Sequence, residues 1–219
     1  MHAHRSWIIA AALAAPLVFT LGCDDDDDDN GGGPSGTTVL VTSEFDAQNG
    51  VVGVSDDGAD VTGATVTLNG TAATAGAAGV YNVALPAPLT AGDDLDLNIL
   101  FDDATVDGLG DLPEAGVITA PADLAEFGVD QEIPITWTST ADPARWVVEA
   151  EGATLETFDV AGGATRAFNI PAGDLGAGTW TISVVAVNDG AVTGDTEAGS
   201  TMTIRNVSVT NPGITVTAP

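Results

Sequence analysis

The stretch Gly178-Thr179-Trp180-Thr181-Ile182-Ser183-Val184-Val185-Ala186-Val187 alternates apolar side chains with smaller or polar ones. Trp180, Ile182 and Val184 fall at every second position, so an extended chain places them on one face. This period of two predicts a long β-strand that turns the apolar face toward a core.

The same alternation recurs on both sides of this stretch. Leu95, Leu97 and Ile99 share one face of a second segment, and polar residues lie opposite them. Turn signals such as Asp57-Gly58 and Asn69-Gly70 separate the apolar runs, and no long segment has a helical period. We therefore predict an all-β chain with strands near residues 38–43, 51–55, 65–68, 80–85, 95–101, 133–137, 146–148, 155–160, 166–170, 179–187, 201–209 and 214–217.

The order of these strands favours two tandem β-sandwiches. We expect a first Ig-like sandwich over residues 37–102, an acidic linker over 103–116, and a second, fibronectin type III-like sandwich over 117–219. An export leader over residues 1–22 and a tether over 23–36 precede them.

Two sets of residues resemble known sandwich families. Val61-Thr62-Gly63-Ala64-Thr65-Val66, followed by Gly79-Val80-Tyr81, resembles the start of carboxypeptidase-regulatory-like and related Ig-like sandwiches. Ile118-Thr119-Ala120-Pro121, Ile133-Pro134-Ile135-Thr136-Trp137 and the stretch 178–184 together resemble fibronectin type III-like sandwiches, above all those in Ser/Thr-rich wall proteins of the Kre9/Knh type. The resemblance implies accessory or adhesive modules, with no catalytic residues to transfer.

Cys23 is the single cysteine, and it ends a leader that holds Arg5 and then an apolar run from Trp7 to Leu21. A basic start followed by a short apolar run is typical of an export signal, and the run is shorter than the ~20 residues that span a bilayer. Phe19-Thr20-Leu21-Gly22-Cys23 resembles the lipobox of bacterial lipoprotein precursors. The resemblance implies cleavage before Cys23, a lipid on its thiol, and an exported chain anchored in the inner or outer membrane of a cell envelope.

Six aspartates, Asp24 to Asp29, follow the cysteine, and Gly31-Gly32-Gly33-Pro34 comes soon after. Such a segment repels itself and cannot bury a core, so we predict a disordered Asp/Gly-rich tether. Metal binding by the aspartate run is the alternative. Fully extended, the tether could hold the first sandwich ~40 Å from the membrane.

The composition of the exported chain limits its chemistry. Beyond residue 22 it has no histidine and no lysine, and three arginines against 32 acidic residues leave a formal charge of −29. This charge repels nucleic acid, which we therefore do not expect as a partner. Without histidine the chain lacks the usual general base near neutral pH and the commonest ligand for zinc or copper. We expect a non-catalytic protein, with a carboxylate-dependent glycan hydrolase as the alternative.

One segment has the oxygen spacing of a calcium loop of twelve residues. Gly108 stands at the sixth position, where such a loop turns sharply. The candidate ligands are Asp103, Thr105, Asp107, the carbonyl of Leu109, Asp111 and Glu114. Ca²⁺ is thus the one cofactor that the sequence suggests, and an acidic hinge without metal is the alternative interpretation.

Three tryptophans remain in the exported chain. Trp137 and Trp180 fall on the apolar faces of their predicted strands, so we expect both in the core. Trp146 follows Arg145 near a strand start and is the candidate for an exposed, ligand-binding platform.

These observations favour an envelope-anchored lipoprotein that acts as a binding or structural module on a protein or glycan partner. A calcium-stiffened surface spacer is the second hypothesis, and the hydrolase is the third.

Overall fold

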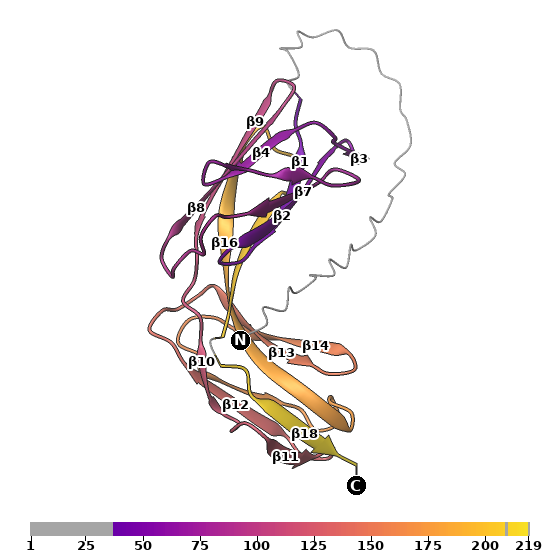
Figure 1. The fold of residues 1–219 in the computed structure, drawn as a ribbon, viewed down its shortest axis with the longest axis vertical. Coiled ribbons are helices and arrows are strands. Elements are labelled where there is room, and N and C mark those ends of the chain that lie inside the picture. The colour runs from indigo at the N-terminus through magenta and orange to yellow at the C-terminus, as the bar shows by residue number, and fades with distance from the viewer. Residues whose placement is uncertain (1–36, 209, 219) are drawn as a thin grey trace, which may run out of the picture. The chain divides into compact units, whose positions relative to one another are not determined.

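The computed structural model describes residues 37–208 and 210–218, and within them it confirms an all-β chain (Figure 1). The leader 1–22, Cys23 and the tether to residue 36 lie outside the described residues. Among the residues described, no helix is long and apolar enough to cross a membrane.

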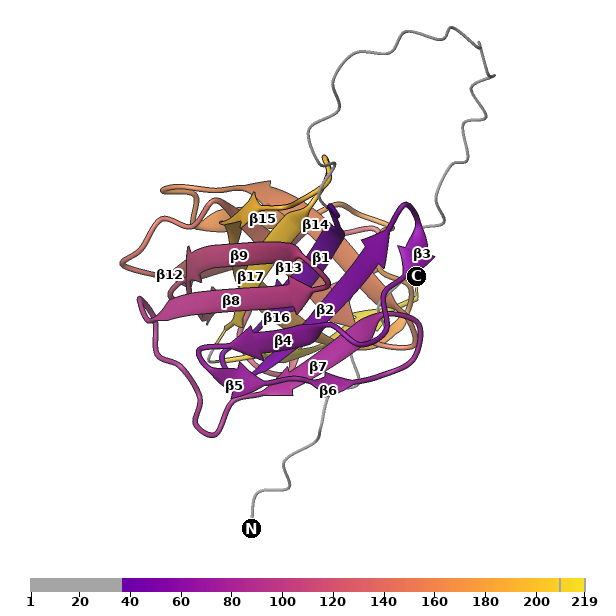
Figure 2. The same cartoon turned by 90° about the horizontal axis from the view of Figure 1, so that it is seen from above.

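The first sandwich is built from two sheets that enclose one core (Figure 2). One sheet has the order β6-β7-β2-β1-β17 with β3 beside β2, and the other has the order β5-β4-β8-β9 with the end of β16 beside β9. Its strands are β1 (Leu40–Phe45), β2 (Asn49–Asp56), β3 (Ala59–Asp60), β4 (Thr65–Leu68), β5 (Thr71–Ala72), β6 (Thr74–Ala75), β7 (Val80–Ala84), β8 (Asp94–Phe101) and β9 (Ala104–Asp111), with parts of β16 (Gly178–Gly194) and β17 (Thr201–Val207).

The Gly79-Val80-Tyr81 motif fixes the irregular segment between β3 and β4. The buried Tyr81 hydroxyl donates to the carbonyl of Val61 at 3.0 Å and accepts the N–H groups of Gly63 and Ala64. Gly79 has a φ of 67°, and a Cβ there would lie 2.5 Å from the Val54 carbonyl oxygen. Only glycine satisfies both the left-handed backbone and the close approach of β2.

The second sandwich has its own core. The sheet β14-β13-β16-β18-β11 faces the sheet β10-β12-β15 across a cluster of buried residues. Its strands are β10 (Val117–Ala120), β11 (Ala125–Gly128), β12 (Ile133–Thr138), β13 (Arg145–Glu151), β14 (Leu155–Ala161), β15 (Ala167–Ile170), β18 (Gly213–Thr217) and the first half of β16. Trp137 and Trp180 are buried in this core, as the alternation predicts.

Two strands belong to both sandwiches. β16 has 17 residues: Gly178–Val187 pair with β18 and β13 in the second sandwich, and Ala191–Gly194 pair with β9 in the first. β17 pairs antiparallel with β16 and parallel with β1, so Met202 and Ile204 pack in the first core. The chain therefore builds β1 to β9 in the first sandwich and β10 to β15 in the second. It returns to the first sandwich through β16 and β17 and ends with β18 in the second.

This path differs from the expected division at 37–102, 103–116 and 117–219. Residues 104–111, expected as linker, form β9, and residues near the C-terminal end complete the first core. The segment is a strand because alternate residues face the first core: Ala104, Val106 and Gly108 are buried, whereas Thr105, Asp107 and Leu109 are exposed. A Cβ on Gly110 would lie 3.2 Å from Gly190 Cα, so the glycine lets β9 approach β16 closely.

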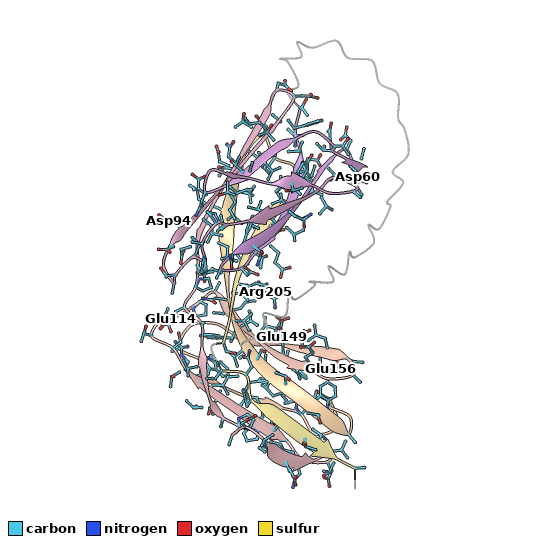
Figure 3. All side chains as sticks on the ribbon, viewed as in Figure 1. Asp60, Asp94, Glu114, Glu149, Glu156 and Arg205 are labelled. Carbon is cyan, nitrogen blue, oxygen red and sulfur yellow. The ribbon has the colours of Figure 1, made fainter. Side chains whose placement is uncertain are left out.

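Arg205 of β17 bridges the two sandwiches from the side of the strand opposite Met202 and Ile204 (Figure 3). It donates to Glu44 of β1 at 2.7 Å and forms a second ion pair with Glu149 of β13. Burial works against the charge on Arg205, but the hydrogen bonds and charges of the two glutamates outweigh it and raise the pKa of the guanidinium. One cation thus ties a strand of each sandwich to β17.

Candidate functional site

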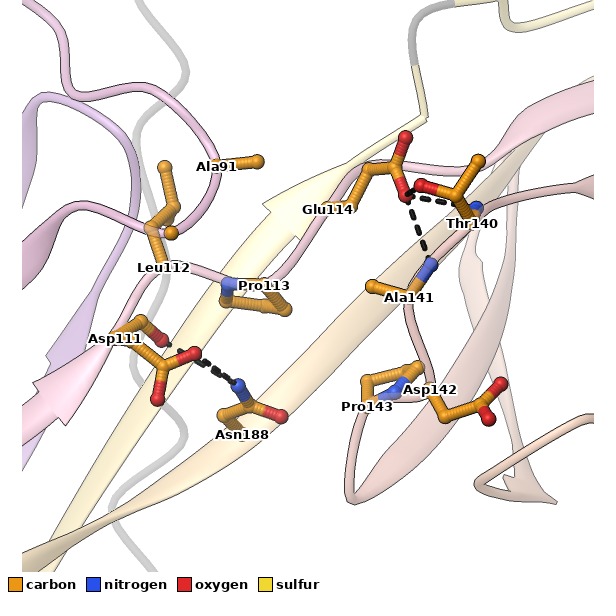
Figure 4. Close-up of a pocket in the computed structure, with 11 residues that line it drawn as sticks. Ala91, Asp111, Leu112, Pro113, Glu114, Thr140, Ala141, Asp142, Pro143 and Asn188 are labelled. Atoms are coloured by element: carbon orange, nitrogen blue, oxygen red, sulfur yellow. Dashed lines mark hydrogen bonds between the residues drawn. The ribbon is translucent and has the colours of Figure 1, made fainter.

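A surface pocket of about 450 Å³ lies where the chain crosses from β9 to the second sandwich (Figure 4). The crossing segment 112–114, the loop 140–143 and the middle of β16 supply most of its wall. The lining residues are Ala91, Gly92, Asp111, Leu112, Pro113, Glu114, Thr140, Ala141, Asp142, Pro143 and Asn188.

Glu114 holds one side of the pocket by binding the loop after β12. Its Oε2 accepts the N–H of Thr140 at 2.7 Å, the Thr140 hydroxyl at 2.6 Å and the N–H of Ala141 at 2.9 Å. The Ser139 hydroxyl is a fourth donor at 3.2 Å. These hydrogen bonds, led by that of the Thr140 hydroxyl, lower the pKa of the Glu114 carboxyl, so it stays ionised near neutral pH.

Arg166 fixes the same loop from the other side. Its Nη2 donates to the carbonyl of Ala141 at 2.6 Å and to Oδ1 of Asp142 at 2.9 Å, while Nη1 donates to Gly163. The guanidinium carbon lies 5.1 Å from the centroid of the Trp146 ring, a cation–π distance. The pocket wall is therefore preorganised by an arginine that packs on the core.

Asn188 of β16 closes the third side. Its Nδ2 donates to Asp111 Oδ2 at 3.1 Å, and its Oδ1 accepts the N–H of Ala144. Asn206 of β17 donates to the carbonyl of Pro113 at 2.8 Å. Two amide side chains on the shared strands thus hold the end of β9 and the crossing segment in place.

The pocket wall exposes the side chains of Asp111 and Asp142 and part of Glu114, whereas its leucine and its two prolines are buried. Asp111, Glu114 and Asp142 each use one carboxylate oxygen in a hydrogen bond or ion pair, which leaves acceptor capacity for hydroxyl or ammonium donors.

The structure does not bring the calcium-loop residues together. Asp103 ends the β8–β9 turn, while Thr105, Asp107, Leu109 and Asp111 alternate along the exposed face of β9. A strand rises ~3.4 Å per residue, so the first and ninth positions lie ~27 Å apart along it. An extended strand cannot wrap these oxygens around one cation, and Glu114 binds the loop 139–141 instead.

Trp146 is buried, which contradicts the expectation of an exposed, ligand-binding side chain. Its exposed fraction is 0%, and its ring lies 5.4 Å from that of Trp137 in the second core. It sits on the inner face of β13, opposite Val160 of β14 and Ala186 of β16. A side chain in this position packs the core and offers no surface to a ligand.

The sequence does not predict one cluster of three carboxylate side chains. Asp56, Asp57 and Glu197 place carboxylate oxygens within 4.8 Å of one another, and the N–H of Asp57 donates to Glu197. Among the described residues these are the side chains grouped closely enough to hold a divalent cation. The Asp57-Gly58 signal indicates a turn, but nothing in the sequence pairs it with a residue 140 positions away.

No family model and no curated protein matches the chain. Among solved structures, it is similar to fibronectin(III)-like modules of Clostridium thermocellum CbhA, with 14% identity over 83% of this chain and 93% of that chain and a TM-score of 0.30. It is also similar to SGBP-B of the Bacteroides ovatus mixed-linkage glucan utilization locus, solved with a mixed-linkage heptasaccharide, with 13% identity, 80% of this chain covered and a TM-score of 0.25. The alignment spans 42% of that second chain. Identities and TM-scores this low carry nothing about function.

Proposed function

We propose that this chain is a non-catalytic, envelope-anchored lipoprotein, in which a stiff double sandwich presents a binding surface to a glycan or protein partner. The observation that carries the stiffness of this double sandwich is β16, which contributes backbone pairing to both sandwiches. A hinge between the sandwiches would have to break this strand, β17 and the Arg205 ion pairs together. Shared strands thus supply the stiffness that the spacer hypothesis assigned to calcium.

The anchor is supported by the residues around Cys23, which resemble a lipobox. An acylated Cys23 would tether the double sandwich through the acidic segment 24–36. Several acyl chains would hold it firmly, because each buried methylene contributes ~0.8 kcal/mol. Cells that make the chain should incorporate an alkyne-labelled palmitate into it. The Cys23→Ala variant should carry no label and should leave the membrane fraction.

The binding surface is supported by the pocket between Glu114 and Asn188. Its oxygen acceptors suit the hydroxyl groups of a glycan. Affinity electrophoresis of the exported chain in gels that contain different polysaccharides tests this directly. We expect retardation in at least one gel, and Asp111→Asn should weaken it. Asp130→Asn, which changes a carboxylate outside the pocket, is the matched control.

Three outcomes separate the alternatives. Retardation that depends on Asp111 supports a glycan-binding pocket. Binding of the chain to an envelope protein, with no retardation in any polysaccharide gel, indicates that the partner is a protein. Release of reducing sugar ends, lost on replacing one acidic residue, would establish a hydrolase and overturn the non-catalytic proposal.

A further inference from the structure

We propose that the double sandwich is built to bear tension between its N-terminal anchor and a partner held by the second sandwich. The inference rests on the proposed function for the direction of the load, because Cys23 is the expected point of attachment. The architecture that carries the load is visible in the described residues alone.

The load enters at the start of the first sandwich. Val39, the residue before β1, donates its N–H to the carbonyl of Asp195 and accepts the N–H of Glu197. The N–H of Val41 donates to the Ser200 hydroxyl at 3.0 Å. Val39, Val41 and Phe45 are all buried in the first core, so the strand next to the tether is held by packing as well as by hydrogen bonds.

The pairing of β1 with β17 is parallel, and this decides how force acts on it. Thr42 to Phe45 lie opposite Thr201 to Ile204 in the same direction. The anchor pulls β1 from its first residue, while the second sandwich pulls β17 from its last residues, which pair with β16. Parallel strands pulled from opposite ends slide against each other. Their hydrogen bonds then resist together, whereas strands pulled from the same end separate one bond at a time.

The load passes to the second sandwich without a flexible linker. β17 pairs with Val185–Gly190 of β16, and β16 continues into the second core beside β13. Arg205 adds a charged bridge along this path, from Glu44 on β1 to Glu149 on β13. The two strands that connect the cores are thus also the strands that carry the force.

Single-molecule force spectroscopy tests the proposal on the exported chain, made without residues 1–22 so that the Cys23 thiol is free as one handle. A second handle at Ala153→Cys, in the exposed turn between β13 and β14, loads the chain along the expected axis. A second handle at Ala198→Cys lies in the exposed turn before β17. It pulls β17 at its first residues, the same end at which Cys23 pulls β1, so the two strands separate one hydrogen bond at a time. We expect the rupture force along the first axis to be about two-fold higher or more, because several bonds of similar strength break together.

Equal urea midpoints for the two handle variants establish that each is folded before it is pulled. Glu44→Gln, which removes one ion pair to Arg205, should lower the rupture force along the first axis and leave the first peeling step unchanged. Rupture forces that are equal in both geometries, or lower along the first axis, overturn the proposal. No partner is present in this experiment, so a failure to find a glycan or protein ligand leaves its result unaffected.

Discussion

Replacing Arg205 with methionine removes the cation between Glu44 and Glu149 and keeps most of the aliphatic packing. The side chains of Arg205 and Glu149 are 26% and 19% exposed, and that of Glu44 is 38% exposed. Breaking a fully buried ion pair costs ~3–5 kcal/mol, whereas an exposed pair contributes ~0–1 kcal/mol. This bridge is intermediate in burial, so we expect a loss of about 2 kcal/mol. For a chain of this size that corresponds to a fall in Tm of about 4–8 °C.

Urea unfolding followed by tryptophan fluorescence measures this loss. Arg145→Met is the matched control, because Arg145 and its partner Asp189 are 42% and 62% exposed. We expect the control to change the free energy of unfolding by less than ~1 kcal/mol. The reasoning fails if Arg205→Met destabilises the protein no more than Arg145→Met does, since the bridge would then be an ordinary surface pair.

Three further substitutions test separate parts of the structure. Gly110→Ala should destabilise the protein by ~1–3 kcal/mol, because its methyl group meets Ile204 and the Gly190 backbone; a neutral effect in urea unfolding would indicate a linker instead of a strand. Glu114→Gln should lower the urea midpoint near neutral pH. The folded state lowers the pKa of Glu114, so its stabilisation is present above the unfolded pKa and is lost as the pH falls through the folded pKa. The gap between the two midpoints should therefore narrow as the pH falls below the ordinary range of a carboxyl group, and a gap that widens there would reverse the assignment. Trp146→Phe should reduce stability by ~1–3 kcal/mol and leave any polysaccharide retardation unchanged; weaker retardation with an unaltered urea midpoint would contradict the burial of Trp146.

The strands that the sequence predicts best are those with large apolar residues at alternate positions. The first half of β16 follows from Trp180, Ile182 and Val184, because their spacing reports one buried face directly. Its second half, Asn188 to Gly194, has the composition of a turn. It is a strand because β17 and β9 pair with it, and Gly190 lets them pack closely: a Cβ there would lie 2.6 Å from the sulfur of Met202 and 3.0 Å from the Leu109 carbonyl oxygen. Such long-range pairing leaves no periodic signal.

The candidate site shows the same limit. Glu114 stands out in the sequence by its position in an acidic run, but its partners Thr140 and Ala141 lie 26 and 27 residues away. No spacing rule links a carboxylate in the crossing segment to backbone N–H groups of the loop after β12. Trp146 was expected at the surface because Arg145 precedes it, whereas the arginine that covers its ring is Arg166, from a different loop.

We infer that the two sandwiches form one cooperative body through β16 and β17. All three tryptophans that follow residue 22 lie in the second core, so their fluorescence reports on the second sandwich alone. Leu97→Ala creates a cavity in the first core and should cost ~2–5 kcal/mol. We expect this substitution to lower the urea midpoint of tryptophan fluorescence as much as that of far-ultraviolet circular dichroism. A tryptophan transition that stays in place while the first sandwich unfolds early would contradict it.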